Sequence, residues 1–233
     1  MTNKTKNFLS SIKSHQESKK DKKFEGTLSE YLELIETAPD IASLAHNRLY
    51  EAIVEHGVTR LDESNSRCQK IFNGEKLKTY DYFQSQFFGI ERPIKKIMRF
   101  LRSAALRGEE SRQVLLLLGP VGAGKSALVE HTKKALEEAA AVYHIKGCPI
   151  REEPLHLIPR SLRDEFKETY GITIEGDLCP ICRYRLLQEF EGDYMSVPIV
   201  TSTFSIRGRR GIGVVPPMDP NTQDTSLLIG SED

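Results

Sequence analysis

An apolar run that leads directly into a glycine-rich segment constrains the fold of this chain most. Residues 114–118 read Val-Leu-Leu-Leu-Leu, and residues 119–126 read Gly-Pro-Val-Gly-Ala-Gly-Lys-Ser. A short apolar run that ends at glycine is typical of a strand buried on both faces, as in a parallel sheet covered by helices. Residues 127–129, Ala-Leu-Val, suit the helix that would follow. We therefore predict strand, loop and helix in succession, within an α/β fold that contains a parallel sheet.

The loop matches the pattern G-x-x-x-x-G-K-[ST] at every fixed position. Its glycines let the backbone fold so that successive N–H groups point at an anion, and the start of the next helix adds partial positive charge. We predict that the loop binds the phosphates of a purine nucleotide, with ATP as the first candidate. Lys125 is expected to contact the β- and γ-phosphates, and the Ser126 hydroxyl to coordinate Mg²⁺. The predicted binding residues are Gly119, Pro120, Val121, Gly122, Ala123, Gly124, Lys125, Ser126 and Ala127.

Nucleotide hydrolysis also requires an acidic group, usually at the end of a second apolar strand. Residues 197–200 are apolar but lead into Thr-Ser-Thr. Residues 227–229 precede Glu232 and Asp233, with a Gly-Ser pair between them, and are a weak alternative. We therefore assign neither a catalytic residue nor an arginine finger from the sequence.

The N-terminal half carries helical signals. Thr27 stands three residues before Glu30, which indicates a capping box at a helix start, and Pro39 ends the apolar periodicity that follows. A second helix is expected up to His56 and Gly57, and residues 60–80 are interpreted as a polar connection. A third helix is predicted from about residue 90 to 101, with an apolar face formed by Ile94, Ile97, Met98 and Leu101.

Charge and composition exclude several partners. The chain has 33 basic and 33 acidic residues, so we expect no nucleic-acid partner. Seven lysines between Lys4 and Lys23 indicate a solvated flexible tail, with an arm that binds a partner or nucleic acid as the alternative. The chain contains neither the apolar run of a secretory signal nor a segment apolar enough to span a bilayer, so we expect a cytoplasmic protein without a membrane partner.

Cys179 and Cys182 are separated by two residues, the spacing of half a zinc site or of a redox dithiol. Cys148, His144 or His156 could complete a set of zinc ligands. Ordinary reduced cysteines are the expected state, with zinc and redox chemistry as the alternatives. The isolated histidines, among them His131, are expected at the surface or at helix ends.

Several blocks together resemble the PrkA family of bacterial serine protein kinases. The similar segments are residues 24–33, 118–126, 145–149, 154–159, 162–166, 170–172, 174–177, 211–213 and 219–220, with Gln223 and Asp224. The resemblance therefore runs from about residue 24 to the end of the sequence. Ala123 stands where glycine is frequent in the family.

The resemblance implies an AAA-type P-loop ATPase core, incomplete here because family members are much longer. Together with the lysine-rich start and the polar residues 60–80, it divides the chain into a basic tail (1–25), a helical extension and linker (26–80), and the N-terminal portion of the ATPase domain (81–233). It also implies serine phosphorylation of a protein substrate and a homo-oligomeric ring in the complete protein, with residues 88–90 near the adenine. Residues 88–90 could instead belong to the core. The alternative functions are an ATP-driven remodelling or protease-coupled machine, and a nucleotide-binding switch without catalysis.

Overall fold

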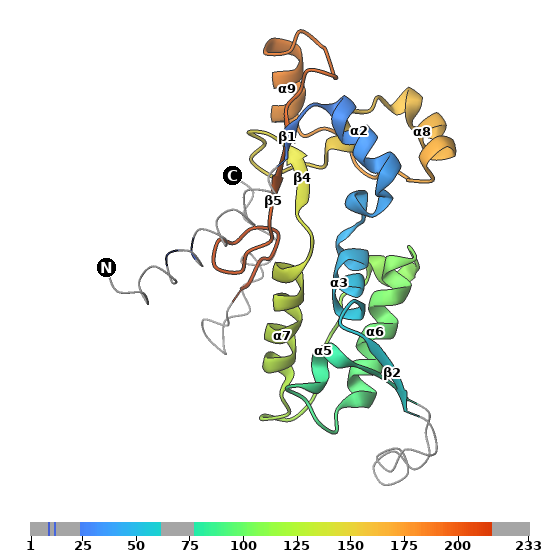
Figure 1. Ribbon diagram of the computed structural model, residues 1–233, viewed down its shortest axis with the longest axis vertical. Coiled ribbons are helices and arrows are strands. Elements are labelled where there is room, and N and C mark those ends of the chain that lie inside the picture. Colours follow the sequence, from blue (N-terminus) through green and yellow to red (C-terminus); the bar gives the residue numbers. More distant parts are fainter. Residues whose placement is uncertain (1–8, 10–11, 13–23, 62–76, 216–233) are drawn as a thin grey trace. The chain divides into compact units, whose positions relative to one another are not determined.

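A computed structural model describes residues 9, 12, 24–61 and 77–215 (Figure 1). The lysine-rich tail apart from Leu9 and Ile12, Cys68, and residues 216–233 lie outside these ranges. The chain forms two compact units. Unit 1 joins the described residues up to Asn47 with Ala140–Thr203, and unit 2 joins Arg48–Ala139 with the described residues from Phe204 onward. The domain boundaries expected near residues 25 and 80 remain predictions.

Unit 1 contains a sheet of three short strands in the order β1-β5-β4. The strands are β1 (Glu25–Gly26), β4 (Val142–Ile145) and β5 (Ile199–Ser202). Both pairings are antiparallel, with Ile145 opposite Ile199 and Gly26 opposite Ile199 on the other side. β-Branched and aromatic side chains dominate β4 and β5, as is usual for strands that are buried on at least one face.

Helices of unit 1 accompany this sheet, and several share its hydrophobic core. They are α2 (Leu28–Thr37), α8 (Arg163–Tyr170) and α9 (Pro180–Gln188), with the short 3₁₀ helices η1 (Pro39–Ala42), η3 (Pro154–Leu157) and η4 (Arg160–Leu162). The predicted start of α2 is confirmed, because the Thr27 N–H donates to Glu30 Oε2 at 2.8 Å. Tyr31 and Ile35 on α2 and Ile145 and Ile199 on the strands are completely buried, and they form the centre of this core.

Unit 2 is mainly helical. Its elements are α3 (Ala45–Val54, which begins just before the boundary), β2 (Val58–Leu61), β3 (Leu77–Tyr80), α5 (Asp81–Gln84), α6 (Glu91–Ala105), η2 (Glu109–Arg112) and α7 (Lys125–Glu138). β2 and β3 pair antiparallel, with Leu61 opposite Leu77. The interpretation of residues 60–80 as a polar connection is therefore wrong at both of its ends. Most of β2 is exposed, so its sequence carries little of the alternation that would reveal a strand.

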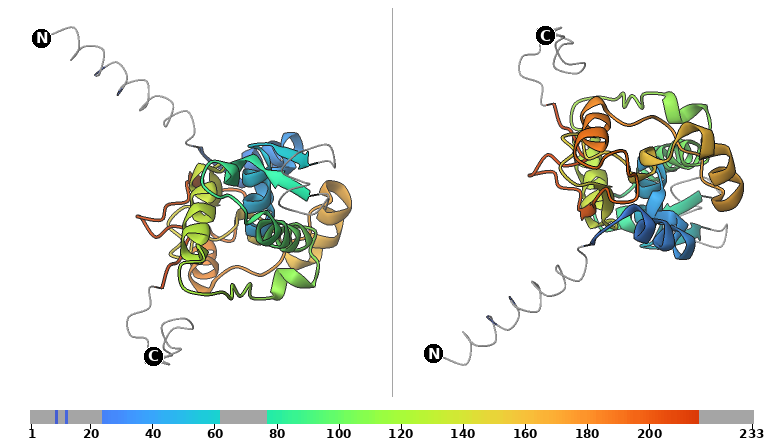
Figure 2. Two further views of the ribbon diagram at one scale, coloured as in Figure 1. Left: turned by 90° about the horizontal axis from the view of Figure 1, so that it is seen from below. Right: turned by 90° about the horizontal axis from the view of Figure 1, so that it is seen from above.

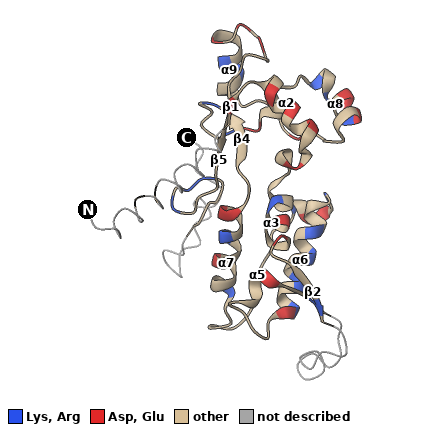
Figure 3. Cartoon of the chain, viewed as in Figure 1, with Lys and Arg blue, Asp and Glu red and all other residues tan. Residues whose placement is uncertain are grey.

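The predicted third helix is confirmed as α6. Ile94, Ile97, Met98 and Leu101 recur at helical spacing, and all are buried. They share a core with Phe83 and with residues of α3 and α7. Lys95, Lys96 and Arg99 of the same helix are exposed, and Figure 3 marks the Lys and Arg positions of α6 in blue. The amphipathic pattern therefore identifies both the helix and its buried face.

The segment 114–118 differs from the prediction. It forms no strand, and Val114, Leu116 and Leu118 are 92%, 72% and 84% exposed. Figure 2 shows it as an irregular extended trace that leads to α7. Both sheets in the described part of the chain are antiparallel, so the expected parallel sheet is not observed there. A strand requires a hydrogen-bonded neighbour, and none of the described residues pairs with this segment.

Among the residues that the structure covers, no helix combines the length and the apolar character needed to cross a bilayer.

Candidate functional site

The loop between the apolar segment and α7 has the backbone shape that its glycines permit. Gly122 and Gly124 have φ angles of +80° and +77°, in the left-handed region that favours glycine. A Cβ atom built at either position would meet no atom within 4 Å. The requirement for glycine here therefore comes from the backbone conformation, and the space in front of the loop is open.

The N-terminus of α7 lacks the usual protein partners. Gly124 is the N-cap residue, so it has no side chain that could accept a hydrogen bond, and the first turn contains no acidic residue. The first N–H groups of a helix have no partner within the helix, and together they carry partial positive charge. An uncapped helix start that follows an open glycine loop has the donors and the charge that an anion requires.

Lys125 folds back over the loop that precedes it. Its Nζ donates hydrogen bonds to the carbonyl oxygens of Gly119 and Pro120, both at 2.7 Å. Ser126 and Ala127 follow in the first turn and are exposed. The ammonium group and the Ser126 hydroxyl are thus on the same solvent-accessible end of the helix. Contact between Lys125 and a bound anion would exchange the two carbonyl hydrogen bonds for contacts with the anion.

α7 is anchored by a histidine that the sequence had suggested would lie at the surface. His131 is 8% exposed, which contradicts that expectation. Its ring stacks on Tyr82 with the centroids 4.3 Å apart, and it also contacts Phe83 and Phe87. Aromatic neighbours from α5 and the following residues bury this ring, and they hold the helix that begins at the glycine loop.

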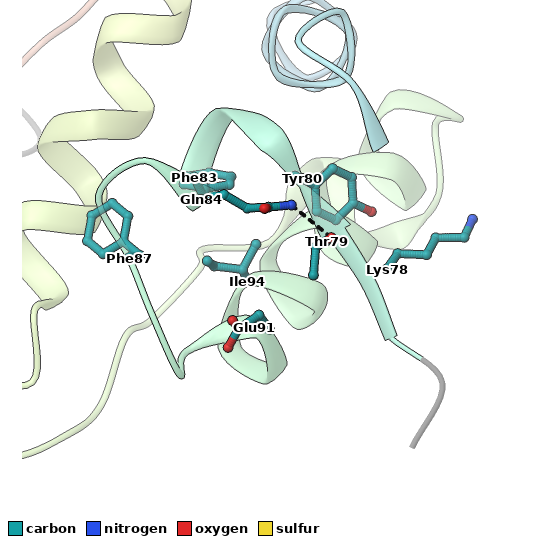
Figure 4. A pocket seen from close by; sticks show the side chains of 8 residues that line it. All are labelled: Lys78, Thr79, Tyr80, Phe83, Gln84, Phe87, Glu91 and Ile94. Atoms are coloured by element: carbon teal, nitrogen blue, oxygen red, sulfur yellow. Dashed lines mark hydrogen bonds between the residues drawn. The ribbon is translucent and has the colours of Figure 1, made fainter. Parts of the chain in front are cut away.

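The segment expected near an adenine, residues 88–90, is largely exposed. Phe88 is 74% exposed. A hollow beside it, bordered by Phe87 and Glu91 among other residues, has a volume of about 10 Å³ (Figure 4). That volume is close to what a single water molecule needs. Figure 4 also shows the hydrogen bond from Gln84 Nε2 to Thr79 Oγ1 in the wall of this hollow, at 2.9 Å.

A second hollow, of about 200 Å³, lies beside α7. Leu115 and Leu117 border it from the extended segment, and Leu128 and Leu136 from the helix. Its wall is apolar except at Thr132 and Lys133. It therefore offers apolar contact and few of the polar groups that a nucleoside would need.

The three candidate zinc ligands come together in unit 1. Cys148, Cys179 and Cys182 lie close to Glu152, and the four potential ligand atoms are within 4.8 Å of one another. Of the two candidate histidines, His156 contacts the Glu152 carboxylate, and His144 instead has Nδ1 3.1 Å from the Ile145 carbonyl oxygen. Sequence reasoning missed Glu152, because a glutamate near a single cysteine matches no ligand spacing.

Mixed helices and strands, with a glycine loop that opens a helix, are consistent with an α/β P-loop fold. A family model described as the PrkA AAA domain matches residues 26–233. The chain therefore belongs to the PrkA AAA domain family.

The relatives carry different names. The chain is 39% identical over 232 residues to the "ATP-dependent protease PrkA" of Bacillus subtilis strain 168, covering 97% of this chain and 35% of that protein. It is 30% identical over 234 residues to the "Serine/threonine kinase YeaG" of Escherichia coli K12, with coverages of 97% and 36%. An "Uncharacterized protein in gldA 5'region" of Geobacillus stearothermophilus is 30% identical over 108 residues, 46% of this chain and 98% of the relative.

The chain thus spans about a third of the length of the two longer relatives, 35% of one and 36% of the other. No solved structure matches it.

Proposed function

We propose that this chain binds MgATP through residues 119–126. The observation that carries the proposal is the open glycine loop at an uncapped helix start, with no acidic side chain in the first turn. The AAA family membership supports ATP as the nucleotide. Backbone N–H groups would hold the phosphates, Lys125 would contact the β- and γ-phosphates, and Ser126 would coordinate Mg²⁺.

The residues of the loop would bind and orient the nucleotide. Bound MgATP supplies a γ-phosphoryl group that can be transferred. Lys125 would exchange its hydrogen bonds to Gly119 and Pro120 for contacts with the phosphates, so that its charge is held at the loop whether or not nucleotide is bound. No residue is assigned to activate a nucleophile, and the loop therefore accounts for binding alone.

We also propose that residues 114–118 become a buried parallel strand in the longer protein. Their apolar side chains are exposed, and their backbone has no strand partner among the described residues. The relatives extend well beyond the matched length, so they contain further chain that could pair with this segment. Leu115, Leu116 and Leu118 are the exposed leucines of this segment. Their burial would stabilise such a strand by several kcal/mol, at about 1.5–3 kcal/mol for each side chain.

Phosphoryl transfer to protein serine is the first candidate use of ATP, in a cytoplasmic protein that assembles as a ring. The name of the E. coli relative favours it. ATP-driven remodelling coupled to proteolysis is the second candidate, and the name of the B. subtilis relative favours it at the higher identity of 39%. A nucleotide-binding switch without catalysis is the third.

Calorimetric titration of MgATP and MgADP into this chain tests the binding proposal. Lys125→Ala is the diagnostic variant, and Lys134→Ala is its matched control, because Lys134 is a lysine on the same helix, remote from the glycine loop. We expect binding by the unmodified chain and by Lys134→Ala, with a loss of tenfold or more in Lys125→Ala, equivalent to about 1.4 kcal/mol. Absence of binding in the folded, unmodified chain would refute the proposal.

An assay of a complete family member distinguishes the three candidate uses of ATP. It would be incubated with labelled ATP and an unfolded protein substrate, and then assayed for phosphoserine, for released peptides and for inorganic phosphate. Phosphoserine without peptide release supports the kinase, whereas ATP-dependent peptide release without phosphoserine supports the protease. Tight ATP binding with none of these products supports the switch.

A further inference from the structure

A tight turn places Cys148 and Glu152 next to each other at the end of β4. The Ile145 N–H donates to the Glu152 carbonyl at 3.0 Å, which closes the turn, and the Cys148 N–H donates to the Ile145 carbonyl at 3.2 Å. Gly147 and Arg151 have φ angles of +76° and +51°, as tight turns require. The turn therefore presents a thiol and a carboxylate at one end of the strand.

The start of α9 supplies the other two thiols. Cys179 is its N-cap residue, Pro180 occupies the first turn, and Cys182 follows within that turn. The Cys182 N–H donates to Cys179 Sγ at 3.3 Å, and the Glu152 N–H donates to Cys148 Sγ at 3.4 Å. Hydrogen bonds donated to sulfur favour the charged, metal-binding form of a thiol.

The spacing of these groups suits a tetrahedral ion. Cys148 Sγ lies 3.9 Å from Cys179 Sγ, and a carboxylate oxygen of Glu152 joins the three sulfurs within a mutual distance of 4.8 Å. Zn–S bonds of about 2.3 Å give tetrahedral S···S edges of about 3.8 Å. The three thiols are free, because a disulfide would bring two sulfurs to about 2.05 Å.

Glu152 distinguishes this cluster from a group of ordinary core cysteines. It is only 5% exposed. Its Oε1 accepts a hydrogen bond from the Cys179 N–H at 2.7 Å and lies 3.1 Å from His156 Nδ1. Its Oε2 is buried and has no hydrogen-bond partner among the described residues. A buried carboxylate oxygen without a partner is costly, so Glu152 has a coordination position available for a cation.

Neighbouring groups hold the Glu152 carboxylate in place, and the three thiols lie close to it. His156 lies between Glu152 Oε1 and the Glu175 carbonyl oxygen, the latter 2.6 Å from Nε2. Cys148, Glu152 and Cys182 are buried, and Cys179 is half-buried. A divalent cation would offset both the burial and the crowding of these groups.

We propose that Cys148, Cys179, Cys182 and Glu152 bind one Zn²⁺ as a structural site. Three thiolates and one carboxylate complete a tetrahedral set, and thiolate ligands select zinc over magnesium or calcium. Each thiol releases its proton to solvent when the metal binds. The ion would connect the turn after β4 to the start of α9. His156 is a positioning residue that orients the carboxylate.

The first test uses the unmodified 233-residue chain. It would be purified under reducing conditions, and its metal content measured by elemental mass spectrometry. The apoprotein would then be titrated with Co²⁺, whose thiolate charge-transfer and tetrahedral d–d bands report sulfur ligation directly. We expect one Zn²⁺ per chain and a Co²⁺ titration that saturates at one equivalent.

Matched variants assign the ligands. Cys148→Ser and Cys182→Ser are compared with Cys68→Ser, which removes the fourth cysteine, and Glu152→Gln with Glu168→Gln on the exposed side of α8. We expect a loss of metal affinity of at least about tenfold in Cys148→Ser, Cys182→Ser and Glu152→Gln. The two control variants should bind the metal as the unmodified chain does. His156→Ala should weaken binding without changing the number of thiolates in the Co²⁺ spectrum.

The unmodified chain tests the proposal even where a variant fails to fold. A reduced and folded chain that takes up neither Zn²⁺ nor Co²⁺ would overturn the proposal, as would equal uptake by Cys148→Ser and the unmodified protein. Formation of a disulfide among the three cysteines under mild oxidation, in a chain that binds no metal when reduced, would instead support the redox alternative.

Discussion

Tyr82 and His131 stack with their ring centroids 4.3 Å apart and are joined by two reciprocal hydrogen bonds. The Tyr82 hydroxyl donates to the His131 carbonyl at 2.8 Å, and His131 Nε2 lies 2.9 Å from the Tyr82 carbonyl oxygen. Burial, followed by the charge of Glu138, raises the pKa of Tyr82 to about 12. The pair links α5 to α7, so it supports the helix whose first turn follows the glycine loop.

Removal of the Tyr82 hydroxyl tests this link. Tyr82→Phe should lower the free energy of unfolding by about 1 kcal/mol, since it removes one hydrogen bond and leaves the His131 carbonyl without it. Urea denaturation would measure the change. Tyr184→Phe is the control, because Tyr184 is 66% exposed, and its effect should stay within about 0.5 kcal/mol. Equal effects at the two sites would contradict the structural role of the pair.

Substitutions at two glycines with similar backbone angles distinguish the effect of backbone strain on stability from an effect on ligand binding. Gly124 has a φ angle of +77° and Gly171, after α8, has one of +69°, and an added Cβ meets nothing within 4 Å at either. Alanine at each position should cost about 1–2 kcal/mol of stability because of left-handed strain. Only Gly124→Ala should also weaken MgATP binding in calorimetry. Weakened binding in both variants would indicate a general effect of destabilisation.

The exposure of residues 114–118, before the glycine loop, leads to a further prediction. Leu116→Ala should change the free energy of unfolding of this chain by less than about 0.5 kcal/mol, since Leu116 is 72% exposed. Leu101→Ala, at a buried site on α6, should cost about 2–5 kcal/mol. In a complete family member, the substitution that corresponds to Leu116→Ala should lower the free energy of unfolding about as much as Leu101→Ala does here, if the segment is a buried strand there. A small effect in both proteins would refute that proposal.

His144 on β4 should make stability depend on pH. Burial, the largest cause, lowers its pKa from 6.5; its hydrogen bond to Ile145 opposes the shift and the charge of Arg151 adds to it. The unfolded chain therefore takes up a proton as the pH falls through about 6.5, whereas the folded chain takes it up only at lower pH. The free energy of unfolding should be constant at higher pH and should decrease below this value.

Urea denaturation at several pH values between about 5 and 8 would measure this dependence. His144→Leu should reduce the slope. His56→Gln is the control, because the His56 side chain is 45% exposed. An unchanged slope in His144→Leu would assign the pH dependence to other groups.

Local sequence signals predicted α2, α6 and the start of α7. The capping box at Thr27 and Glu30, the periodic face of α6, and the helix after Gly124 were all confirmed, because each depends on residues within one or a few helical turns. Elements that depend on distant partners were predicted poorly. Residues 114–118 suggested a strand, and β2 and β3 were missed, because whether a segment becomes a strand depends on which segment pairs with it.

The sequence by itself determined the glycine loop, the helix that begins at Lys125 and the family to which the chain belongs, because these reside in contiguous residues. Tertiary structure decided the burial of His131 against Tyr82 and the meeting of Glu152 with Cys179, which are 27 positions apart. Such contacts form only when separate elements pack into one core, and the strength of that packing is spread over many side chains. A motif can therefore specify a loop, whereas a cluster assembled across a core becomes visible only in the folded chain.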